Sequence, residues 1–368
     1  MKQKVYFTDL RTSMHRNMSQ KLMVLLDKAG LLSVVKQNDI VAVKLHFGEK
    51  GNTAFIRPIF LRDIVERIYA CGGRPFLTDS NTLYRGERSD AVAHLTMSLI
   101  HGFNYTAISA PVIIADGLRG KDGENVEISG KHFTKVLIAS AVLQADALVS
   151  VAHFKGHELS GFGGTIKNLG MGCATREGKM KQHSDILPSI EAKKCTACGR
   201  CAAWCPEQAI KIHKMKSKID EKKCIGCAEC IAVCPRDAIK IIWNDNSSVF
   251  QEKMVEYALG AITHKKKKAL YVNFLTNISP ACDCYGHADR PIVPDIGIVA
   301  SRDPVAVDQA SLDLVNAEQG FFNTALTMNH DRQMDKFKGL YPQVDGEIQL
   351  AHAQLLGMGT RNYELIRV

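Results

Sequence analysis

The sequence predicts an α/β fold with a largely parallel open sheet, into which a small cysteine-rich α+β module is inserted. Three observations support this prediction. Short runs of Val, Ile and Leu alternate with segments of helical periodicity over residues 1–190, a pattern typical of strands joined by crossover helices. Eight of the twelve cysteines fall between Cys195 and Cys234. The alternation of strand-like and helix-like segments resumes after that block.

The first part of the chain contains five candidate strands, each a short apolar run typical of a strand buried on both faces. A crossover helix is predicted over residues 56–69, because apolar residues recur there at helical spacing and the segment ends at Gly72 and Gly73. The predicted strands are residues 40–45, 75–77, 111–115, 135–138 and 147–152.

The second part of the chain continues the same pattern. Helices are predicted over residues 249–261 and 304–317, and strands over residues 269–275 and 296–300. Asp303 and Pro304 supply the N-cap and the first turn of the last helix. We therefore predict one α/β domain formed by residues 1–190 and 244–368, with residues 191–243 inserted as a module. Three consecutive domains are the alternative.

The cysteine block contains the pattern C-x₂-C-x₂-C-x₃-C-P twice, with first cysteines 29 residues apart and with Ala-Ile-Lys-Ile closing each copy. This internal duplication is typical of a bacterial-type ferredoxin with two [4Fe–4S] clusters. Three closely spaced thiolates reach three irons of one cube, and the cysteine before Pro reaches the other cube. The expected ligands are Cys195, Cys198, Cys201 and Cys234 for cluster one, and Cys224, Cys227, Cys230 and Cys205 for cluster two.

Two zinc knuckles are the alternative for this block, because C-x₂-C pairs also bind zinc. A tetrahedral zinc ion has no use for four cysteines per copy in this spacing, so the cluster interpretation is favoured. Ligation by cysteine alone predicts low reduction potentials, and two adjacent clusters predict an electron relay.

Composition and charge place further bounds on the function. The chain has 368 residues, of which 46% are hydrophobic and 23% charged, as expected for a globular protein. Its N-terminus lacks the features of a signal peptide, and no apolar run approaches membrane-spanning length, so we expect a cytoplasmic protein with no membrane partner. The formal charge of +9 falls to about +5 with eight thiolates and two clusters. The Lys run at residues 265–268 is interpreted as a solvated helix end, and no nucleic-acid partner is predicted.

Polar residues follow the predicted strands at the positions where open parallel sheets bind ligands. His46 follows the first strand, Asp79 the second, and His153, Lys155 and His157 the fifth. His and Lys bind metal, phosphate or carboxylate, whereas simple turns favour Gly, Pro, Asn and Asp. We therefore predict one functional cleft that includes Asp79 and has the catalytic candidates His46, His153, Lys155, His157 and Lys167. The alternative is that each is an ordinary surface residue or helix cap.

A glycine-rich segment at residues 156–168 leads from the fifth strand into a predicted helix. Its backbone N–H groups can hold an anion with Lys167 as the counter-charge, although the segment is not a Walker A loop. The alternative is a tight turn that needs glycine. Asn277 and the run Ser301-Arg302-Asp303 follow later strands and extend the set of candidates, but Asp303 also fits a helix N-cap.

Four cysteines lie outside the block. Cys71 ends a predicted helix and is interpreted as a small core residue. Cys282 and Cys284 form a C-x-C pair in a polar loop, and Cys173 lies in a Gly-rich loop. These three side chains form a candidate metal site if they converge in space. The alternative is that they are ordinary thiols, and the sequence leaves both possibilities open.

Six segments connect the chain with a known family. They are KLHFGEKGN from Lys44, LTDSNTLY from Leu77, HFKGHE from His153, GGTIKNLGMGC from Gly163, CDC from Cys282 and DPVAVD from Asp303. On these segments nearly the whole chain resembles the domain-of-unknown-function family 362, iron–sulfur proteins of anaerobic bacteria and archaea. The resemblance implies an α/β host with a ferredoxin insertion and an anaerobic setting, and it supplies no substrate.

Two classes of function follow from these observations. The first is a reductase, in which two low-potential [4Fe–4S] clusters feed electrons to a substrate or cofactor held in the α/β cleft. The second is a non-enzymatic electron carrier, or a factor that delivers metal or cofactor to a partner protein. Both predict an electron-donor or electron-acceptor protein as partner. No GxGxxG fingerprint is present, so a dinucleotide bound by that motif is not predicted.

Overall fold

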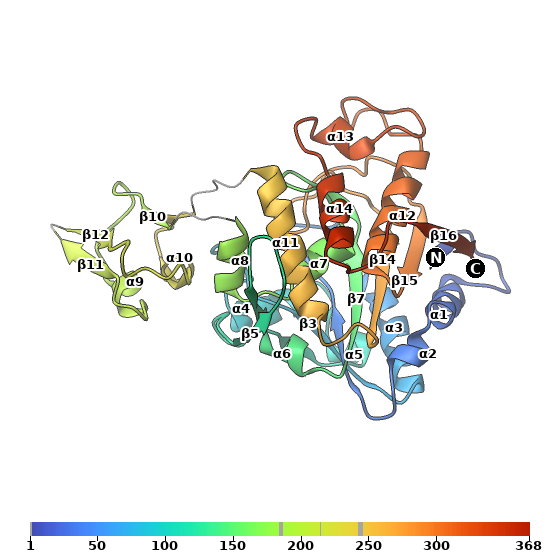
Figure 1. The fold of residues 1–368 in the computed structure, drawn as a ribbon, viewed down its shortest axis with the longest axis horizontal. Helices are drawn as coiled ribbons and strands as arrows, with labels where there is room; N and C mark the ends of the chain where they lie inside the picture. Colours follow the sequence, from blue (N-terminus) through green and yellow to red (C-terminus); the bar gives the residue numbers. More distant parts are fainter. Residues whose placement is uncertain (1, 184–186, 214, 242–245) are drawn as a thin grey trace.

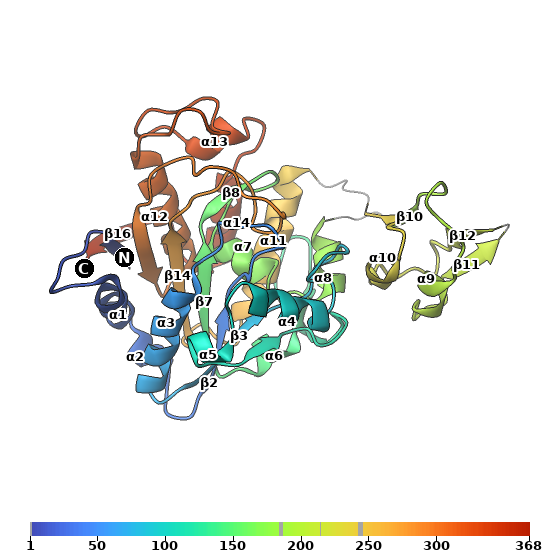
Figure 2. The ribbon, with the colours of Figure 1, turned by 180° about the vertical axis from the view of Figure 1, so that it is seen from behind.

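The computed structural model describes residues 2–183, 187–213, 215–241 and 246–368. In these residues an eight-stranded sheet lies at the centre, with helices on both faces and a cysteine-rich insert at one side (Figures 1 and 2). The strands of the sheet are β1 (Gln3–Asp9), β2 (Ile40–Lys44), β3 (Arg74–Asp79), β4 (Val112–Ile114), β7 (Ala147–His153), β14 (Ala269–Leu275), β15 (Gly297–Ser301) and β16 (Tyr363–Arg367).

The strand order is β16-β1-β15-β14-β7-β2-β3-β4. The five strands from β14 to β4 are mutually parallel, whereas β15 is antiparallel to both of its neighbours. The predicted α/β fold with a largely parallel open sheet is therefore confirmed. The edge strand β16 and its neighbour β1, which pair in parallel, were not predicted.

One predicted strand lies outside this sheet. Residues 135–138 fall in β6 (Lys135–Ala139), which pairs with β5 (Gly123–Glu127) in a separate antiparallel hairpin. The chain reverses within a few residues between these two strands, and such a short connection can join only antiparallel strands. The apolar run was enough to predict a strand but not its partner.

Two apolar cores cover the two faces of the sheet. Along β7, Leu148 packs into one core while Val149 and Val151 pack into the other, which explains why this strand is a continuous apolar run. The first core includes α6 (Ser140–Gln144), α7 (Thr165–Gly170), α11 (Ser247–Ile262), α12 (Pro304–Ala317), α13 (Lys336–Leu340) and α14 (Glu347–Leu355). The second includes α1 (Met18–Lys28), α2 (Leu31–Val34), α3 (Pro58–Ala70), α4 (Ala91–Ile100) and α5 (Tyr105–Ile108).

The insert lies between α8 (Arg176–His183) and α11 along the chain and projects to one side of the host (Figure 1). Its elements are β10 (Ser189–Ile190), α9 (Arg200–Ala203), β11 (Ile210–His213), β12 (Lys216–Ile219), α10 (Glu229–Val233) and β13 (Ile239–Lys240). β10 pairs with β13, and β11 pairs with β12. The predicted boundary between residues 243 and 244 lies outside the described residues, so the division into domains stays a prediction.

A buried ion pair joins the insert to the host. Arg176 Nη1 lies 3.1 Å from Glu229 Oε1, and each side chain is 1% exposed. Lys121 approaches the same carboxylate at 3.6 Å, and Arg119 stacks over Trp204. These contacts hold α10 and the end of α9 against α8 and the host loop of Arg119 and Lys121.

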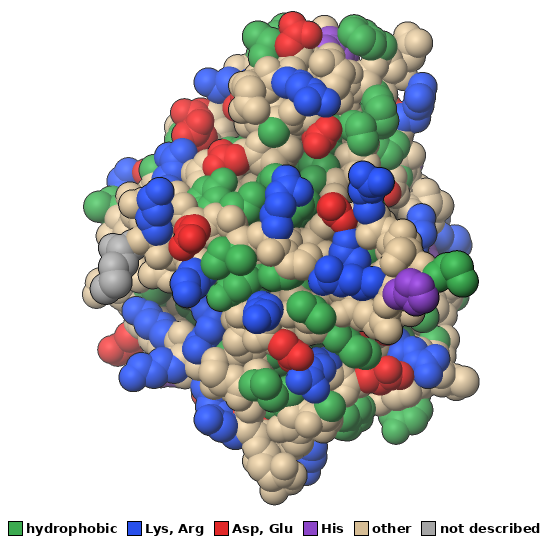
Figure 3. Space-filling view, turned by 90° about the vertical axis from the view of Figure 1, so that its right-hand side faces the viewer, with side chains coloured by type: hydrophobic (Ala, Val, Ile, Leu, Met, Phe, Trp, Pro, Cys, Tyr) green, Lys and Arg blue, Asp and Glu red, His purple; other side chains and the backbone are tan. Residues whose placement is uncertain are grey.

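The face of the host that points away from the insert carries Lys and Arg side chains among acidic and apolar ones (Figure 3). The positive charge on this face is spread out rather than gathered into one patch. Among the described residues, no helix combines the length and apolar character that crossing a membrane requires.

Candidate functional site

A cavity of about 660 Å³ lies at the carboxyl ends of β2, β3 and β7. Parallel strands end at the same edge of a sheet, so residues that follow them are brought together there. The cavity is lined by all six residues that the sequence placed in one cleft: His46, Asp79, His153, Lys155, His157 and Lys167. Their convergence is shown, whereas their catalytic roles stay predictions.

The other strand-end candidates do not line the cavity. Asp303 caps α12 by accepting from the N–H groups of Val305 and Ala306, and Arg302 donates to the Lys267 carbonyl. Because β15 runs antiparallel to β14, its end lies at the opposite edge of the sheet.

A short hairpin carries two of the cavity residues. Lys155 and His157 lie on β8 (Lys155–His157), which pairs with β9 (Gly161–Gly163). Residues two apart on a strand face the same side, so both side chains reach the cavity. Gly156 between them packs against the Pro280 carbonyl, where a Cβ atom would clash. The glycines of this segment therefore serve close packing.

Lys44 and Asp79 form a buried ion pair in the wall of the cavity, with Nζ 3.1 Å from Oδ1. Burial would raise the pKa of Asp79, but the charges of Lys44 and its neighbours outweigh burial and hold that pKa well below its usual range. Lys44 also donates to Asn168 Oδ1 at 2.8 Å. The carboxylate is thus ionised and fixed.

Asp283 fixes two of the predicted catalytic residues. Its Oδ1 lies 2.8 Å from His153 Nδ1, and its Oδ2 lies 2.9 Å from Lys155 Nζ. His153 Nε2 lies 3.0 Å from the Thr276 carbonyl. Both ring nitrogens of His153 therefore face acceptors, and neither is left to bind a metal. Asp283 therefore holds His153 and Lys155 in the cavity wall.

His46 and His157 are two cavity histidines whose Nδ1 accepts a hydrogen bond from the backbone. His46 Nδ1 accepts from the Gly48 N–H at 2.9 Å, and His157 Nδ1 accepts from the Ser160 N–H at 3.2 Å. Burial, joined by nearby positive charge, holds the pKa of both rings well below the usual value. The neutral rings therefore carry their proton on Nε2, where each can donate.

Cys282 lies in the cavity next to a cation. Its Sγ accepts from Lys167 Nζ at 3.3 Å and from the Cys284 N–H at 3.4 Å. A hydrogen bond from the Cys284 thiol, assisted by the charge of Lys167, lowers the pKa of Cys282 despite its burial. The same interaction raises the pKa of Cys284. Cys282 is therefore the thiolate of the pair.

The predicted convergence of Cys173 with this pair is not found. Cys173 packs in the first apolar core and does not line the cavity, and burial raises its pKa to about 11. Within the described ranges, no three His, Cys, Asp or Glu side chains are placed to hold one metal ion. The Gly-rich segment that carries Cys173 ends α7 and turns it into the core. A metal site of Cys173, Cys282 and Cys284 is therefore unsupported.

Several cavity residues were missed by sequence reasoning. Lys44 is the last residue of an apolar strand, and a charged residue in such a run is itself a signal. Lys179 and His183 lie four residues apart on α8 and so share one helical face. Arg88 comes from a loop with no distinctive pattern, and Tyr84 ends the family segment that begins at Leu77, which assigned it no role. All five line the cavity.

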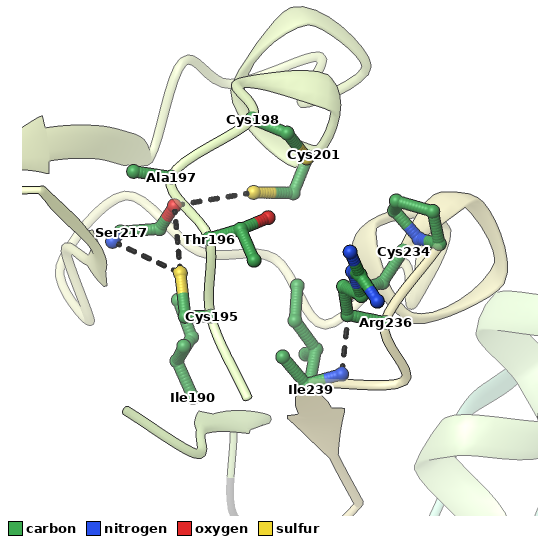
Figure 4. Close-up of a pocket in the computed structure, with 12 residues that line it drawn as sticks. Ile190, Cys195, Thr196, Ala197, Cys198, Cys201, Ser217, Cys234, Arg236 and Ile239 are labelled. Atoms are coloured by element: carbon green, nitrogen blue, oxygen red, sulfur yellow. Dashed lines mark hydrogen bonds between the residues drawn. The ribbon is translucent and has the colours of Figure 1, made fainter. Parts of the chain in front are cut away.

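The insert contains two further hollows, each lined by four cysteines. One is lined by Cys195, Cys198, Cys201 and Cys234, and the other by Cys205, Cys224, Cys227 and Cys230. These are the two crossed sets expected from the sequence. Ser217 Oγ lies 3.6 Å from Cys195 Sγ and 3.7 Å from Cys201 Sγ (Figure 4).

The cysteine before each proline has the same backbone environment in both copies. Cys205 Sγ accepts from the Ala209 N–H and Cys234 Sγ from the Ala238 N–H, both at 3.2 Å. Hydrogen bonds of this kind stabilise a thiolate and tune an iron–sulfur cluster. The donor sets and their surroundings are therefore compatible with iron–sulfur binding.

Comparisons with solved structures give distant likenesses. The lactate racemase apoprotein from Thermoanaerobacterium thermosaccharolyticum is 12% identical, with a TM-score of 0.37, over 74% of this chain and 50% of that one. A protein from Thermotoga maritima is 8% identical, with a TM-score of 0.37, over 92% of this chain and 59% of that one. This chain thus spans about half to three-fifths of those chains, and neither likeness bears on function. No curated protein matches.

A family model described as "Domain of unknown function (DUF362)" matches residues 41–313. The match runs from β2 into α12 and contains the strand-end cavity and both cysteine quartets. The chain therefore belongs to the DUF362 family.

Proposed function

We propose that this chain is an iron–sulfur oxidoreductase, in which two [4Fe–4S] clusters on the insert exchange electrons with a small anionic molecule in the strand-end cavity. One shared side chain carries the proposal. Leu83 lines the cavity and also packs in one apolar cluster with Cys201, Cys230 and Cys234. Two residues on, Arg85 donates to the Cys234 carbonyl at 3.2 Å. One short host segment therefore touches both the cluster ligands and the cavity.

The arrangement of the quartets supports clusters rather than single ions. The thiolates of a four-iron cube bind different irons, so they lie further apart than the ligands of one zinc ion, whose bonds are about 2.3 Å long. Four cysteines surround each hollow, yet in the described part of the chain no three ligand side chains are placed to share one ion. All-cysteine clusters supply one-electron transfer at low potential.

The charge of the cavity wall supports an anionic ligand. Three of its cations already have carboxylate partners, because Lys44, Arg88 and Lys155 pair with Asp79, Glu49 and Asp283. Lys179 donates instead to Ser80 Oγ at 2.5 Å and to the Ala174 carbonyl at 2.7 Å, and burial lowers its pKa to about 8. A bound anion would supply the partner that stabilises this ammonium group.

The neutral histidines supply hydrogen-bond donors for a ligand that gains negative charge on reduction. His46 and His157 both line the cavity and present Nε2–H groups. Donors held in a buried site stabilise charge that develops on a ligand, and the protons of a reduction then come from solvent. The ammonium groups of Lys167 and Lys179 stabilise negative charge that develops on a reduced ligand.

The first test is analytical. Protein purified without oxygen should contain about eight irons and eight acid-labile sulfides per chain, and dithionite should produce the paramagnetic spectrum of two interacting clusters. Stoichiometric zinc without acid-labile sulfide would refute the proposal.

The second test separates an enzyme from a carrier. Reduced protein is incubated with the small-molecule fraction of a cell extract, and the compounds that change are followed by mass spectrometry. Wild type and Lys181→Met should transform at least one anionic compound, and Lys179→Met should lose that activity. Lys181 is the matched control because it lies on the same helix with its side chain 47% exposed. All three proteins should reduce methyl viologen equally. If no compound changes while electrons still pass to the viologen dye, the carrier function takes the place of this one.

A further inference from the structure

We propose that Cys282 and Cys284 form a redox-active dithiol that exchanges two electrons with the clusters of the insert. The inference rests on the proposed function for the source of those electrons. It assigns a chemical role to a pair of residues that the sequence presented as candidate metal ligands.

The geometry of the pair fits a dithiol. The turn that joins the two cysteines directs the Cys284 N–H onto Cys282 Sγ at 3.4 Å. Both side chains line the cavity, although Cys282 is only 1% exposed. The two cysteines, one residue apart in the sequence, therefore face the same cavity, and Cys282 is shielded from bulk solvent.

The surroundings favour an ionised Cys282. Lys167 Nζ donates to its sulfur at 3.3 Å, and the pKa of the thiol is lowered by its hydrogen bond with Cys284 and by the charge of Lys167. A thiolate beside a thiol is the reduced, reactive form of a thiol–disulfide couple. Buried structural cysteines such as Cys173 lack these donors.

A direct connection leads from the insert to the pair. Tyr84 Oη donates to the Cys284 carbonyl at 3.0 Å, and the adjacent residue, Arg85, donates to the Cys234 carbonyl at 3.2 Å. Tyr84 also accepts from Arg88 Nη2 at 3.2 Å, which fixes its hydroxyl group. A residue of cluster one and a residue of the dithiol are thus bound to neighbouring residues of one segment.

The number of electrons that the two clusters carry equals the number that a disulfide takes up. Each of two clusters carries one electron, and cleavage of one disulfide takes two. In the reduction, the bond between Cys282 Sγ and Cys284 Sγ breaks, and each reduced cluster loses one electron. One proton from the solvent binds Cys284 Sγ, and Cys282 stays a thiolate beside the Lys167 ammonium group. Read in reverse, the same step returns two electrons to the clusters one at a time.

The test uses the whole protein with its clusters in place. Trypsin releases the two cysteines together in the peptide of residues 269–302, which contains no other cysteine. The protein is oxidised anaerobically with thionin and alkylated with iodoacetamide before and after reduction by dithionite. In the oxidised protein we expect this peptide unalkylated and lighter by two hydrogen atoms, and after reduction we expect it alkylated at both sulfurs.

An electron count provides the independent measurement. Thionin-oxidised wild type should take up about four electrons per chain from dithionite, and Cys284→Ser should take up about two with its cluster content unchanged. Cys71→Ser, which removes a thiol at the end of α3 far from the pair in sequence, should match the wild type. Equal uptake by all three proteins would overturn the inference.

The outcomes separate this inference from the proposed function. If Cys284→Ser fails to assemble its clusters, the wild-type peptide mass decides alone, and full alkylation of oxidised wild type overturns the dithiol. A protein without acid-labile sulfide instead refutes the proposed function. The state of the cysteine peptide is read in either case.

Discussion

Replacing Lys167 by Met should raise the pKa of Cys282, because it removes the cation closest to the thiolate. Two unit charges 3.3 Å apart attract each other by about 5 kcal/mol at an effective dielectric constant of about 20. The hydrogen bond from the Cys284 N–H to Cys282 Sγ remains in the variant, so we expect a smaller effect. A rise of about 2 pH units from the value of about 5 corresponds to roughly 3 kcal/mol.

The assay is the pH dependence of iodoacetamide alkylation of reduced protein, read on the 269–302 peptide. Only the thiolate reacts, so the midpoint of the rate profile reports the pKa. Lys167→Arg is the control because it keeps the positive charge. Its midpoint should lie within about 0.5 pH unit of the wild-type midpoint. A Lys167→Met midpoint equal to that of the wild type would refute the electrostatic reasoning.

The same shift has a consequence for stability. The folded-state pKa of Cys282 lies below the value of about 8.5 that a free thiol has in the unfolded chain. Its ionisation therefore contributes stability that is fully present above that value and is lost as the pH falls through about 5. Lys167→Met should reduce this contribution, and urea unfolding at two pH values measures it.

Three further outcomes are expected. Cys205→Ala should damage cluster two although it lies in the first copy of the motif, and loss of cluster one in its spectrum would show that the ligands do not cross. Glu229→Gln should destabilise the contact between the insert and the host by roughly 3 kcal/mol, because it leaves Arg176 buried without its carboxylate partner. Unchanged hydrogen exchange of the α10 backbone amides would contradict this. Gly172→Ala should destabilise the fold by about 1–3 kcal/mol, because the added methyl group would displace the Lys44 ammonium group. Urea unfolding measures this change, and a midpoint equal to that of the wild type would contradict the prediction.

The parallel sheet could be predicted because its strands are buried on both faces. Such strands are short apolar runs that need no partner to be recognised, and β14 and α12 were predicted with their observed bounds. The cleft followed from the same logic, since His46, Asp79 and His153 end parallel strands. The sequence pattern does not show which distant segments pair with each other. Neither the antiparallel direction of β15 nor the pairing of the two chain ends could therefore be predicted.

The candidate site was predictable in its members but not in their roles. Its position after a predicted strand made His153 a catalytic candidate. Only the fold shows that Asp283 and the Thr276 carbonyl engage both of its ring nitrogens. Likewise, nothing in the sequence separates Cys173 from the C-x-C pair. That separation depends on the turn after α7, which directs Cys173 into the core.

The pairing of β10 with β13 has a consequence for the way the insert joins the host. It sets Ser189 opposite Lys240, so the polypeptide enters and leaves the insert at neighbouring points. The roughly fifty residues of the insert therefore replace what would be a short surface loop of the host. The entropy lost when the ends of this long segment are brought together is offset by the β-strand pairing within the insert. The host sheet therefore accommodates the insert at a position where a short surface turn would also fit.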